Sequence, residues 1–329
     1  MASLRRLYRA APIARREHRN LPGYLCLLVC LPFLMMLLAL CIPRVRADDH
    51  LSQYLYADTR QLVRLVEDAA DLVERKGTAA FPEFGEQGSR WLNEKYYFFI
   101  YDAEGTCVFH GASTELVGKN LLDFKDMHGK PVIRYITEIG RQPAPDANGW
   151  VFYLWPDKNG FMPKWKAAYI RKALASDGHL YLVGSGIYDF KMERIFVQRN
   201  VQRAAEMLAR EGKAAAYRAF RDLSSPFNFF ETYVYVTDAR GRTVVDPAYP
   251  EIQGRDLSGM RDAIGRPVMS EVVEKLRTRD EAWVQYLWPR PGAALPSRKL
   301  LYARKVRVGG ETLILGSTFY LASPIWMKQ

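Results

Sequence analysis

Two lysines in similar surroundings are the side chains of this sequence best suited to bind a ligand. Lys166 lies in "PKWKAAY" and Lys299 in "PSRKLLY", and each is followed three residues later by a tyrosine, Tyr169 or Tyr302. A lysine at the mouth of a pocket supplies a positive charge for a carboxylate. Most lysines are solvated, so an exposed strand edge is the alternative. In a regular strand the lysine and the tyrosine point to opposite faces, so either the lysine precedes the strand or only one of the pair reaches a ligand.

An aromatic phrase occurs twice, as "WVFYLWP" at 150–156 and as "WVQYLWP" at 283–289. Alternate side chains of a strand share a face, so Tyr153 and Trp155 lie together and the one changed letter falls on the other face. The corresponding pair in the second copy is Tyr286 and Trp288. The repeated face is either a packed core or an aromatic pocket wall in which the tyrosine hydroxyl binds a ligand.

One position at the end of a predicted hairpin differs between the copies. His110 precedes Gly111 in the first copy, and Asp246 stands at the same place in the second. Each side chain either contacts a ligand or ends a strand as an ordinary polar residue. Asp102 and Asp238 each precede a glycine by three residues, which predicts turn formation instead of binding.

Recognisable catalytic motifs are missing from the sequence. There is no His-Glu-x-x-His, no phosphate-binding glycine loop and no paired-cysteine motif, and "GSG" at 184–186 lacks the pattern of a nucleophile elbow. Three of the four cysteines lie within 24–42, which leaves only Cys107 for the rest of the chain. An intramolecular disulfide or a cysteine metal site is therefore excluded there. We expect no enzyme activity, no cofactor and no metal.

The candidate residues must be positioned by two copies of one structural unit. Residues 97–121 match 233–257 without a gap, and shorter matches continue to 180–188 against 312–320. Each copy has the same order of patterns: a long helix, a hairpin with an Asp-x-x-Gly turn, a short helix and three more strands. This order predicts an α+β fold of two tandem PAS-like modules, each with an antiparallel meander of five or six strands.

The long helices are predicted from apolar residues at helical spacing. They cover 50–76 and 190–211, with Gly77 and Gly212 as stops, and a short second helix follows each. The apolar positions of the first helix are Leu51, Leu55, Leu62, Leu65, Val66, Ala69, Leu72 and Val73.

The N-terminal 47 residues explain most of the positive charge. The formal net charge is +11, and eight arginines with one glutamate precede residue 48. The remainder is nearly balanced, so no nucleic-acid partner is expected. Residues 24–42 form an uncharged apolar run that can span a bilayer, and the arginines before it predict a cytoplasmic N-terminus with the rest outside, in the periplasm of a two-membrane cell. The run is either an uncleaved anchor in the inner membrane or a signal peptide removed near Ala47.

The ordered motifs of each copy resemble those of the Cache family, and the chain looks like two tandem single-Cache modules of the second type. The motifs of the first copy are G-K-N, D-x-x-G-x-P, Y-x-W-P, P-x-x-K-x-x-Y and G-S-G-I-Y. They are carried by Gly118, Lys119, Asn120, Asp126, Gly129, Pro131, Tyr153, Trp155, Pro156, Lys166, Tyr169, Gly184, Ser185, Gly186 and Tyr188.

The resemblance implies an extracytoplasmic PAS-like sensor that binds a small molecule, often a short carboxylate, over its central sheet. The second copy departs from the pattern, because Asp246 replaces His110 and Thr318 replaces Gly186. These changes leave open whether the second copy binds a different ligand or none. No kinase, cyclase or methyl-accepting segment follows the second copy in this sequence, so a separate membrane sensor or transporter is the expected partner.

We therefore expect a leader at 1–47, a first Cache module at 48–190 and a second at 191–326. The expected function is sensing or capture of a short organic acid outside the cytoplasm. A structural module at the membrane without a ligand and an unrecognised hydrolase are the alternatives. The expected ligand-binding residues are Lys166, Tyr153, Trp155, Tyr169, His110, Lys299, Tyr286, Trp288, Tyr302 and Asp246.

Overall fold

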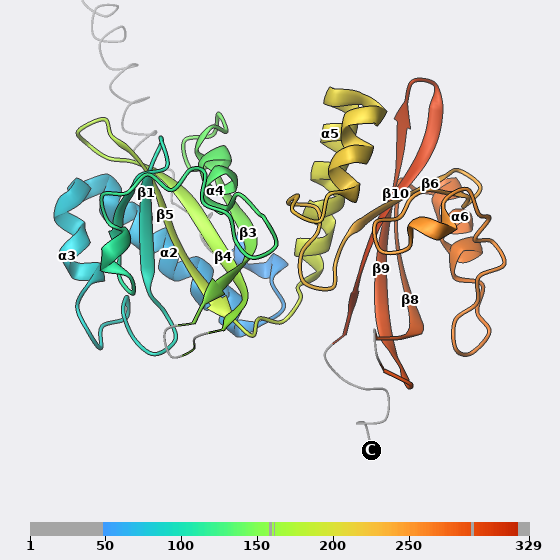
Figure 1. Cartoon of the computed structure of the whole chain (residues 1–329), viewed down its shortest axis with the longest axis horizontal. Helices are drawn as coiled ribbons and strands as arrows, with labels where there is room; N and C mark the ends of the chain where they lie inside the picture. Colours follow the sequence, from blue (N-terminus) through green and yellow to red (C-terminus); the bar gives the residue numbers. More distant parts are fainter. Residues whose placement is uncertain (1–48, 158–159, 161, 291–292, 322–329) are drawn as a thin grey trace, which may run out of the picture. The chain divides into compact units, whose positions relative to one another are not determined.

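The chain repeats one α+β unit (Figure 1), and each unit is built on a five-stranded antiparallel sheet. The computed structural model describes residues 49–157, 160, 162–290 and 293–321. The first sheet contains β1 (Phe98–Asp102), β2 (Cys107–His110), β3 (Asn148–Pro156), β4 (Pro163–Leu174) and β5 (Leu180–Tyr188). The second contains β6 (Val234–Asp238), β7 (Thr243–Val245), β8 (Glu281–Pro289), β9 (Pro296–Val308) and β10 (Glu311–Tyr320).

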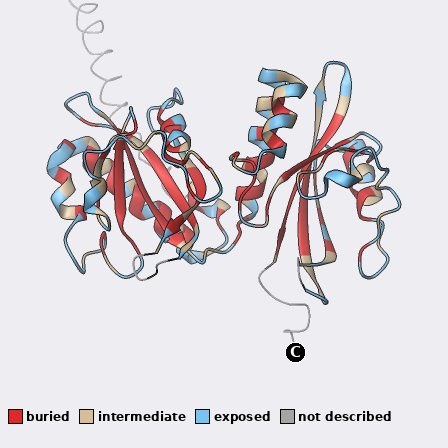
Figure 2. Ribbon diagram, viewed as in Figure 1, coloured by how far each residue is buried: buried red, intermediate tan, exposed pale blue. Residues whose placement is uncertain are grey.

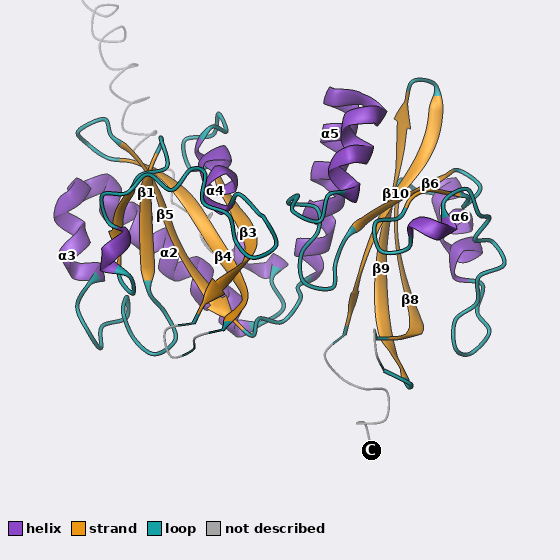
Figure 3. Cartoon of the chain, in the orientation of Figure 1, coloured by secondary structure: helices purple, strands orange, loops and turns teal. Residues whose placement is uncertain are grey.

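Helices flank each sheet, as Figure 3 shows. Those of the first unit are η1 (Asp49–Gln53), α2 (Ala57–Lys76), η2 (Gly77–Ala80), α3 (Phe81–Phe84), η3 (Thr114–Leu116) and α4 (Val132–Gly140). Those of the second are α5 (Arg194–Arg221), η4 (Pro250–Ile252) and α6 (Val268–Thr278). The predicted α+β class with two PAS-like units is confirmed.

The strand order differs in part from the predicted meander. It is β2-β1-β5-β4-β3 in the first sheet and β7-β6-β10-β9-β8 in the second. Only the last three strands of each unit form a meander, because the chain crosses from β2 to the far edge through α4 and then returns to pair β5 with β1. β5 is buried along almost its whole length, which suits a strand with neighbours on both sides.

The first sheet is covered on both faces, and its strands are buried in Figure 2. The face towards α2 carries Trp150 and Phe152, whereas the face towards α4 carries Val151, Tyr153 and Trp155. The alternation predicted for β3 is thus confirmed. In β8, Val284 and Tyr286 again share a face, while Gln285 on the other face is exposed.

Helix α2 is held to β4 by charge as well as by apolar contact. It ends where predicted, at Gly77, whose φ of 57° lies in the left-handed region that glycine tolerates. Arg171 of β4 is buried, and its guanidinium pairs with Glu67 at 2.8 Å, Asp71 at 3.2 Å and Glu74 at 2.9 Å along one side of α2. The sequence patterns did not single out this cluster.

The predicted start of the first helix was too early. α2 begins only at Ala57, and Leu55 is 70% exposed in the connection from η1. The buried carboxylate of Glu193, at the start of α5, accepts the backbone N–H of Leu55 at 2.8 Å and that of Tyr56 at 2.9 Å. Because these two N–H groups bind a side chain, the segment stays extended instead of helical.

Helix α5 continues past its predicted stop. Gly212 has φ 77° and ψ 174°, so it interrupts the helical geometry and divides α5 into two halves. The predicted helix at 190–211 and the predicted short helix after it correspond to these halves. The first half begins six residues after β5 ends and packs on β9 and β10 as well as on residues of the first unit.

Residues 51–329 cluster as one unit, and contacts cross the predicted module boundary at residue 190. The rings of Phe152 and Phe229 stack with centroids 4.1 Å apart. The buried ammonium of Lys130 donates to the carbonyl oxygens of Ser225 at 2.6 Å and Asn228 at 2.5 Å. Each copy has its own sheet, but one hydrophobic cluster includes residues of both copies.

The apolar run at 24–42 lies outside the described residues. Within 49–157, 160, 162–290 and 293–321, no helix is both long and apolar enough to cross a bilayer. The predicted anchor or signal peptide, and its cleavage near Ala47, therefore stay predictions.

Candidate ligand-binding site

Lys166 lies on β4, between β3 and β5 of the first sheet, near the end where β5 terminates at Tyr188. In register, Tyr153 of β3 is opposite Lys166 on one side and Tyr188 of β5 is opposite it on the other. Directly opposed residues of antiparallel strands point to the same face, which here is the face covered by α4. The lysine side chain is only 1% exposed, so it is not the solvated strand-edge residue of the alternative interpretation.

A chain of hydrogen bonds starts at Lys166. Its Nζ donates to the hydroxyl of Tyr97 at 2.7 Å, the Tyr97 and Tyr188 hydroxyls lie 3.0 Å apart, and the Tyr188 hydroxyl donates to the carbonyl of Pro156 at 2.8 Å. The ammonium also lies 3.9 Å from the ring centre of Tyr97 and 4.9 Å from that of Phe99, within cation–π range. Lys166 is thus held in an aromatic cage.

His110, at the end of β2, is a neutral hydrogen-bond donor of this cage. Its Nδ1 accepts the backbone N–H groups of Ala112 at 3.3 Å and Ser113 at 2.9 Å, so the ring proton resides on Nε2. Burial, together with the nearby positive charge of Lys166, lowers the pKa of His110 to about 3. The imidazole ring lies 5.3 Å from the ring of Tyr97.

Tyr153 adds a third polar group to the same face. It is 3% exposed, burial raises the pKa of its hydroxyl, and that hydroxyl has no hydrogen-bond partner among the residues the structure describes. Trp155 packs edge-on against it, with ring centres 5.8 Å apart. We call Lys166, Tyr97, His110, Tyr153 and Tyr188 the Lys166 site.

A glycine makes room for the lysine stem. A Cβ added to Gly186 of β5 would lie 2.5 Å from Cε of Lys166 and 2.8 Å from the carbonyl oxygen of Ala167. Any side chain at this position would therefore displace the lysine. Gly186 belongs to the G-S-G-I-Y motif of the family resemblance, and the close contact with Lys166 gives this glycine a physical role.

Two predicted ligand residues lie on the opposite face. Tyr169 packs in the cluster beneath α2, and its hydroxyl donates to Glu67 at 2.7 Å. Tyr302 packs beside Trp283 in the same cluster. Both tyrosines are separated from their lysines because three residues along a regular strand reverse the side-chain direction. Both lysines lie within their strands and do not precede them, so each lysine and its tyrosine point to opposite faces of the sheet.

Sequence reasoning missed Tyr97 and its counterpart Tyr233 as site residues. Both are the first letters of the matched segments, in "YFFIYD" and "YVYVTD", so their duplication was visible. What the sequence could not show is that β1 pairs with β5, which brings Tyr97 to within hydrogen-bonding distance of Tyr188.

The second unit repeats this arrangement with two changes. Lys299 of β9 is opposite Tyr286 and Tyr320, and the Tyr320 hydroxyl donates to the carbonyl of Pro289 at 2.7 Å. Burial lowers the pKa of Lys299 to about 8, against the opposing effect of nearby carboxylates. We call Lys299, Tyr233, Asp246, Tyr286 and Tyr320 the Lys299 site. Trp288, next to Tyr286, has its ring centre 6.2 Å from that tyrosine.

Asp246 takes over the backbone contacts of His110. Its Oδ1 accepts the N–H groups of Ala248 and Tyr249, each at 3.0 Å. Thr318 occupies the position of Gly186, and Lys299 makes no hydrogen bond to Tyr233 like the one that joins Lys166 to Tyr97. Thr318 thus carries a side chain at the position where a Cβ on Gly186 would meet the stem of Lys166 in the first unit.

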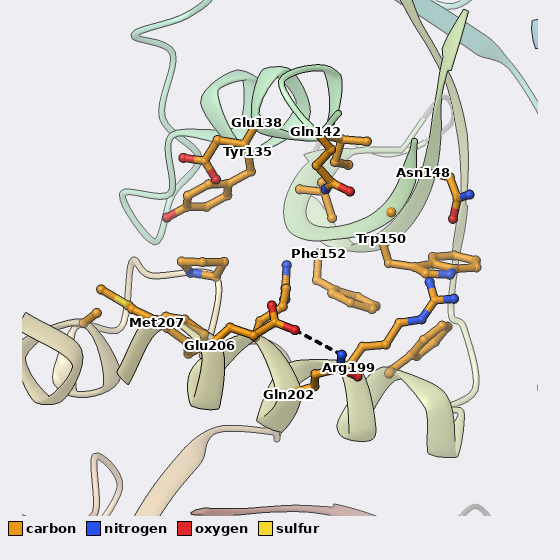
Figure 4. A pocket seen from close by; sticks show the side chains of 18 of the residues that line it. Tyr135, Glu138, Gln142, Asn148, Trp150, Phe152, Arg199, Gln202, Glu206 and Met207 are labelled. Atoms are coloured by element: carbon orange, nitrogen blue, oxygen red, sulfur yellow. Dashed lines mark hydrogen bonds between the residues drawn. The ribbon is translucent and has the colours of Figure 1, made fainter. Parts of the chain in front are cut away.

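A cavity of about 790 Å³ lies elsewhere, between α4, β3 and α5 (Figure 4). Its wall carries charges of both signs, among them Glu138, Glu206 and Arg199. Gln202 donates to Glu206 at 3.0 Å across one turn of α5. None of the predicted ligand residues lines this cavity, and its mixed charges do not favour one class of ligand.

The family comparison matches both units. A model described as Cache domain matches residues 87–195 and, a second time, 191–323. The chain is also 33% identical over 118 residues to the methyl-accepting chemotaxis protein McpP of Pseudomonas putida, a stretch that covers 36% of this chain and 21% of that protein. The chain thus spans about a fifth of the length of this curated relative.

Solved structures with local similarity include sensor domains. A periplasmic sensor domain of a chemotaxis protein is 31% identical, with 37% of this chain and 86% of that chain covered and a TM-score of 0.31. A Cache chemosensory domain described for carboxylic acid recognition is 27% identical, with 38% and 90% covered and a TM-score of 0.33. The ligand-binding domain of the Pseudomonas fluorescens chemoreceptor CtaA, in complex with L-alanine, is 10% identical, with 84% and 92% covered and a TM-score of 0.28.

Proposed function

The chain belongs to the Cache domain family, and on this premise we propose that it is a non-enzymatic binding protein whose first module holds a small carboxylate at the Lys166 site. The observation that carries the proposal is the set of donors on one face of the first sheet. The Lys166 ammonium, the His110 Nε2–H and the Tyr153 hydroxyl come from three different strands. A carboxylate accepts hydrogen bonds at both oxygens and so matches three donors.

The surroundings of these donors favour a short ligand. Aromatic rings of Tyr97, Phe99 and Trp155 surround the polar groups, and such walls exclude water. Charge-assisted hydrogen bonds are stronger in a dry environment than in water. A bound carboxylate would share the Lys166 ammonium with the Tyr97 hydroxyl, so binding would shift the hydrogen-bond chain that leads to Tyr188 at the end of β5.

The proposed setting is outside the cytoplasm. The arginine-rich leader and the apolar run at 24–42 favour an N-terminal anchor or signal peptide. The Pseudomonas putida relative is a chemotaxis protein, which favours a role in sensing. We place the modules at 48–190 and 191–326, and a separate membrane sensor or transporter would receive the binding signal.

A thermal-shift titration tests the proposal. Acetate, lactate and succinate are added to the purified chain, with acetamide and lactamide as uncharged controls. A ligand at a hundred times its Kd stabilises the folded state by about 2.7 kcal/mol. Lys166→Met should weaken carboxylate binding about ten- to hundredfold, because it removes a charge-assisted hydrogen bond.

Lys164→Met is the matched control for this experiment. Lys164 lies on the same strand, but its side chain is 47% exposed and pairs with Asp157 at the surface. This variant should respond to carboxylates like the unaltered chain. If Lys166→Met also keeps the full response, Lys166 is a structural side chain and the first module is a spacer without this ligand.

A further inference from the structure

The one letter that differs between the two aromatic phrases lies at the boundary between the modules. Phe152 of the first copy stacks on Phe229, with ring centres 4.1 Å apart. Its counterpart in the second copy, Gln285, is exposed. Phe229 belongs to residues 222–230, which connect α5 to the second sheet and which we call the junction loop. The changed letter thus gives the first module an aromatic contact for this loop.

Two polar side chains of the first copy bind the same loop. Lys130 is 1% exposed, and its ammonium donates to the carbonyl oxygens of Ser225 at 2.6 Å and Asn228 at 2.5 Å. The Tyr135 hydroxyl donates to the carbonyl oxygen of Ser224 at 2.7 Å. The first module therefore holds the backbone of the junction loop by three hydrogen bonds, two of which come from a charged group.

The counterparts of these two side chains bind within their own module. Arg266 stands at the position of Lys130, and it donates to the carbonyl oxygen of Gln285 at 2.6 Å. Glu271 stands at the position of Tyr135 and forms an ion pair with Arg266 at 2.5 Å. The two copies thus use equivalent positions differently, and only those of the first copy contact the junction loop.

Asp126 connects this contact to the Lys166 site. Its Oδ1 accepts the backbone N–H of Lys130 at 2.9 Å, and its Oδ2 accepts the backbone N–H of Leu154 at 2.9 Å. Leu154 follows Tyr153 on β3, so one carboxylate joins the strand that carries the site to the turn that carries the lysine. A displacement of β3 at the site would therefore move the ammonium that holds the junction loop.

The junction is also strained. Asp189 and Phe230, with φ of 50° and 53°, are the two non-glycine residues of the described backbone that have positive φ. This region is unfavourable for a residue with a side chain. Phe230 is held there by ring contacts with Phe190, at 5.7 Å between centres, and with Trp165, at 6.5 Å. Because the contacts of the loop must offset this strain, the loss of a few of them favours its release.

We propose that the junction loop is a docking element that couples the two modules, held in place by Lys130 as long as β3 keeps its position at the Lys166 site. A rearrangement of β3 weakens the hold on the loop, so the state of the first module controls how firmly the second is attached. The coupling is reciprocal, because release of the loop favours the rearranged β3 by the same factor. The proposal goes beyond the proposed function, since it does not depend on which molecule occupies the site.

Hydrogen–deuterium exchange of the full chain, without added ligand, measures the docking of the loop. Lys130→Met keeps the apolar stem and removes the ammonium, so amides of the junction loop should exchange at least about tenfold faster. Tyr135→Phe removes one neutral hydrogen bond and should accelerate them about two- to tenfold. Lys125→Met, which changes an exposed lysine just before the same turn, is the matched control and should leave exchange unchanged. Unchanged exchange in both test variants overturns the proposal.

A double-mutant cycle tests the coupling itself. Lys166→Met should accelerate exchange in the junction loop about threefold or more, and it should have no further effect in a chain that already carries Lys130→Met. The amides of α6 are the reference for global unfolding, because this helix belongs to the second module but lies outside the loop. Equal acceleration in α6 and in the loop, or an effect of Lys166→Met that persists in Lys130→Met, overturns the proposal. Neither result depends on carboxylate binding, so the proposed function is tested separately.

Discussion

The Lys166 and Lys299 sites lie on equivalent strands but carry different polar side chains. Each has a lysine flanked in register by two tyrosines, and each has a tyrosine hydroxyl that donates to a proline carbonyl. In the first, a glycine beneath the lysine stem lets the ammonium bond to Tyr97. In the second, a threonine stands at the glycine position and an aspartate replaces the histidine. Two substitutions on one scaffold thus change a donor-rich site into a bipolar one.

The difference extends to the elements around the sites. Arg171 in the first sheet is buried among three carboxylates of α2, while its counterpart Arg304 forms an ion pair with the partly exposed Glu281. The first module thus has a buried charge cluster between its long helix and its sheet, whereas α5 and the second sheet share the more exposed pair of Lys213 and Glu311 at 2.6 Å.

Replacing Arg171 with Met should destabilise the chain by about 3–5 kcal/mol, because the variant removes the buried cation that three neighbouring carboxylates share. Arg304→Met should cost less than about 1 kcal/mol, since the Arg304 pair is more exposed. Urea unfolding of both variants measures the difference. Equal losses would contradict the claim that the buried cluster around Arg171 stabilises the fold more than the exposed pair of Arg304 and Glu281 does.

Gly186→Thr should make the first site sterically like the second. The new side chain meets Cε of Lys166, so we expect a loss of about 1–3 kcal/mol in unfolding free energy together with loss of the carboxylate response. A variant that folds stably and still binds acetate would show that Lys166 does not need the space beside Gly186 in order to bind the ligand.

The two lysines should respond oppositely to removal of their charge in the absence of ligand. Lys166→Met breaks the hydrogen bond to Tyr97 and should lower stability by about 1 kcal/mol. Lys299→Met removes a buried ammonium that has no hydrogen bond or ion pair to the residues the structure describes, and it should raise stability by about 1 kcal/mol at neutral pH. Chemical denaturation at pH 7 gives both values, and equal losses would contradict the contrast.

The gain in Lys299→Met should depend on pH. Burial lowers the folded-state pKa of Lys299 to about 8, below the unfolded value of about 10.4. Between these two values the unfolded chain binds more protons, so the unaltered protein becomes more stable relative to the variant as the pH rises. The advantage of the variant should be full below pH 8 and should shrink above it. A pH-independent difference would mean that Lys299 is not desolvated.

Carboxylate binding at the Lys166 site should change little with pH. Because the pKa of His110 is lowered to about 3, its imidazole stays neutral from pH 5.5 to 7.5, and we expect less than about a twofold change in Kd over that range. Calorimetry at several pH values checks this. A Kd that follows a group titrating near pH 6.5 would place His110 in a more solvated environment.

Local patterns predicted much of the fold but not its long-range pairings. Alternation placed Tyr153 and Trp155 on one face, and duplication identified Asp246 as the counterpart of His110. Leu55 fitted the helical spacing, yet Glu193, more than a hundred residues later, binds the backbone there. Likewise, the central position of β5 depends on its pairing with β1, which no local pattern encodes.

The same limit applies to the candidate site. The lysines and the aromatic face were visible as repeated letters, whereas Tyr97 and the role of Gly186 required the pairing of β1, β5 and β4 in space. Tyr169 was included because it lay near Lys166 in sequence, and the strict period of the strand puts it on the other face. The two-residue period of a strand thus predicts to which face each side chain points, but it does not predict which strands pair.

The carboxylate of Glu193 links the two ends of the first module. It ties the chain just before α2 to the chain just before α5, although the whole first sheet lies between them in sequence. The two hydrogen bonds therefore connect the segment ahead of α2 to the start of α5 directly, without passing through the sheet. Because Glu193 follows Tyr188 by only five residues, a shift at the end of β5 pulls on this joint directly. The segment that leads into α2 and the segment that leaves β5 are thus coupled through Glu193.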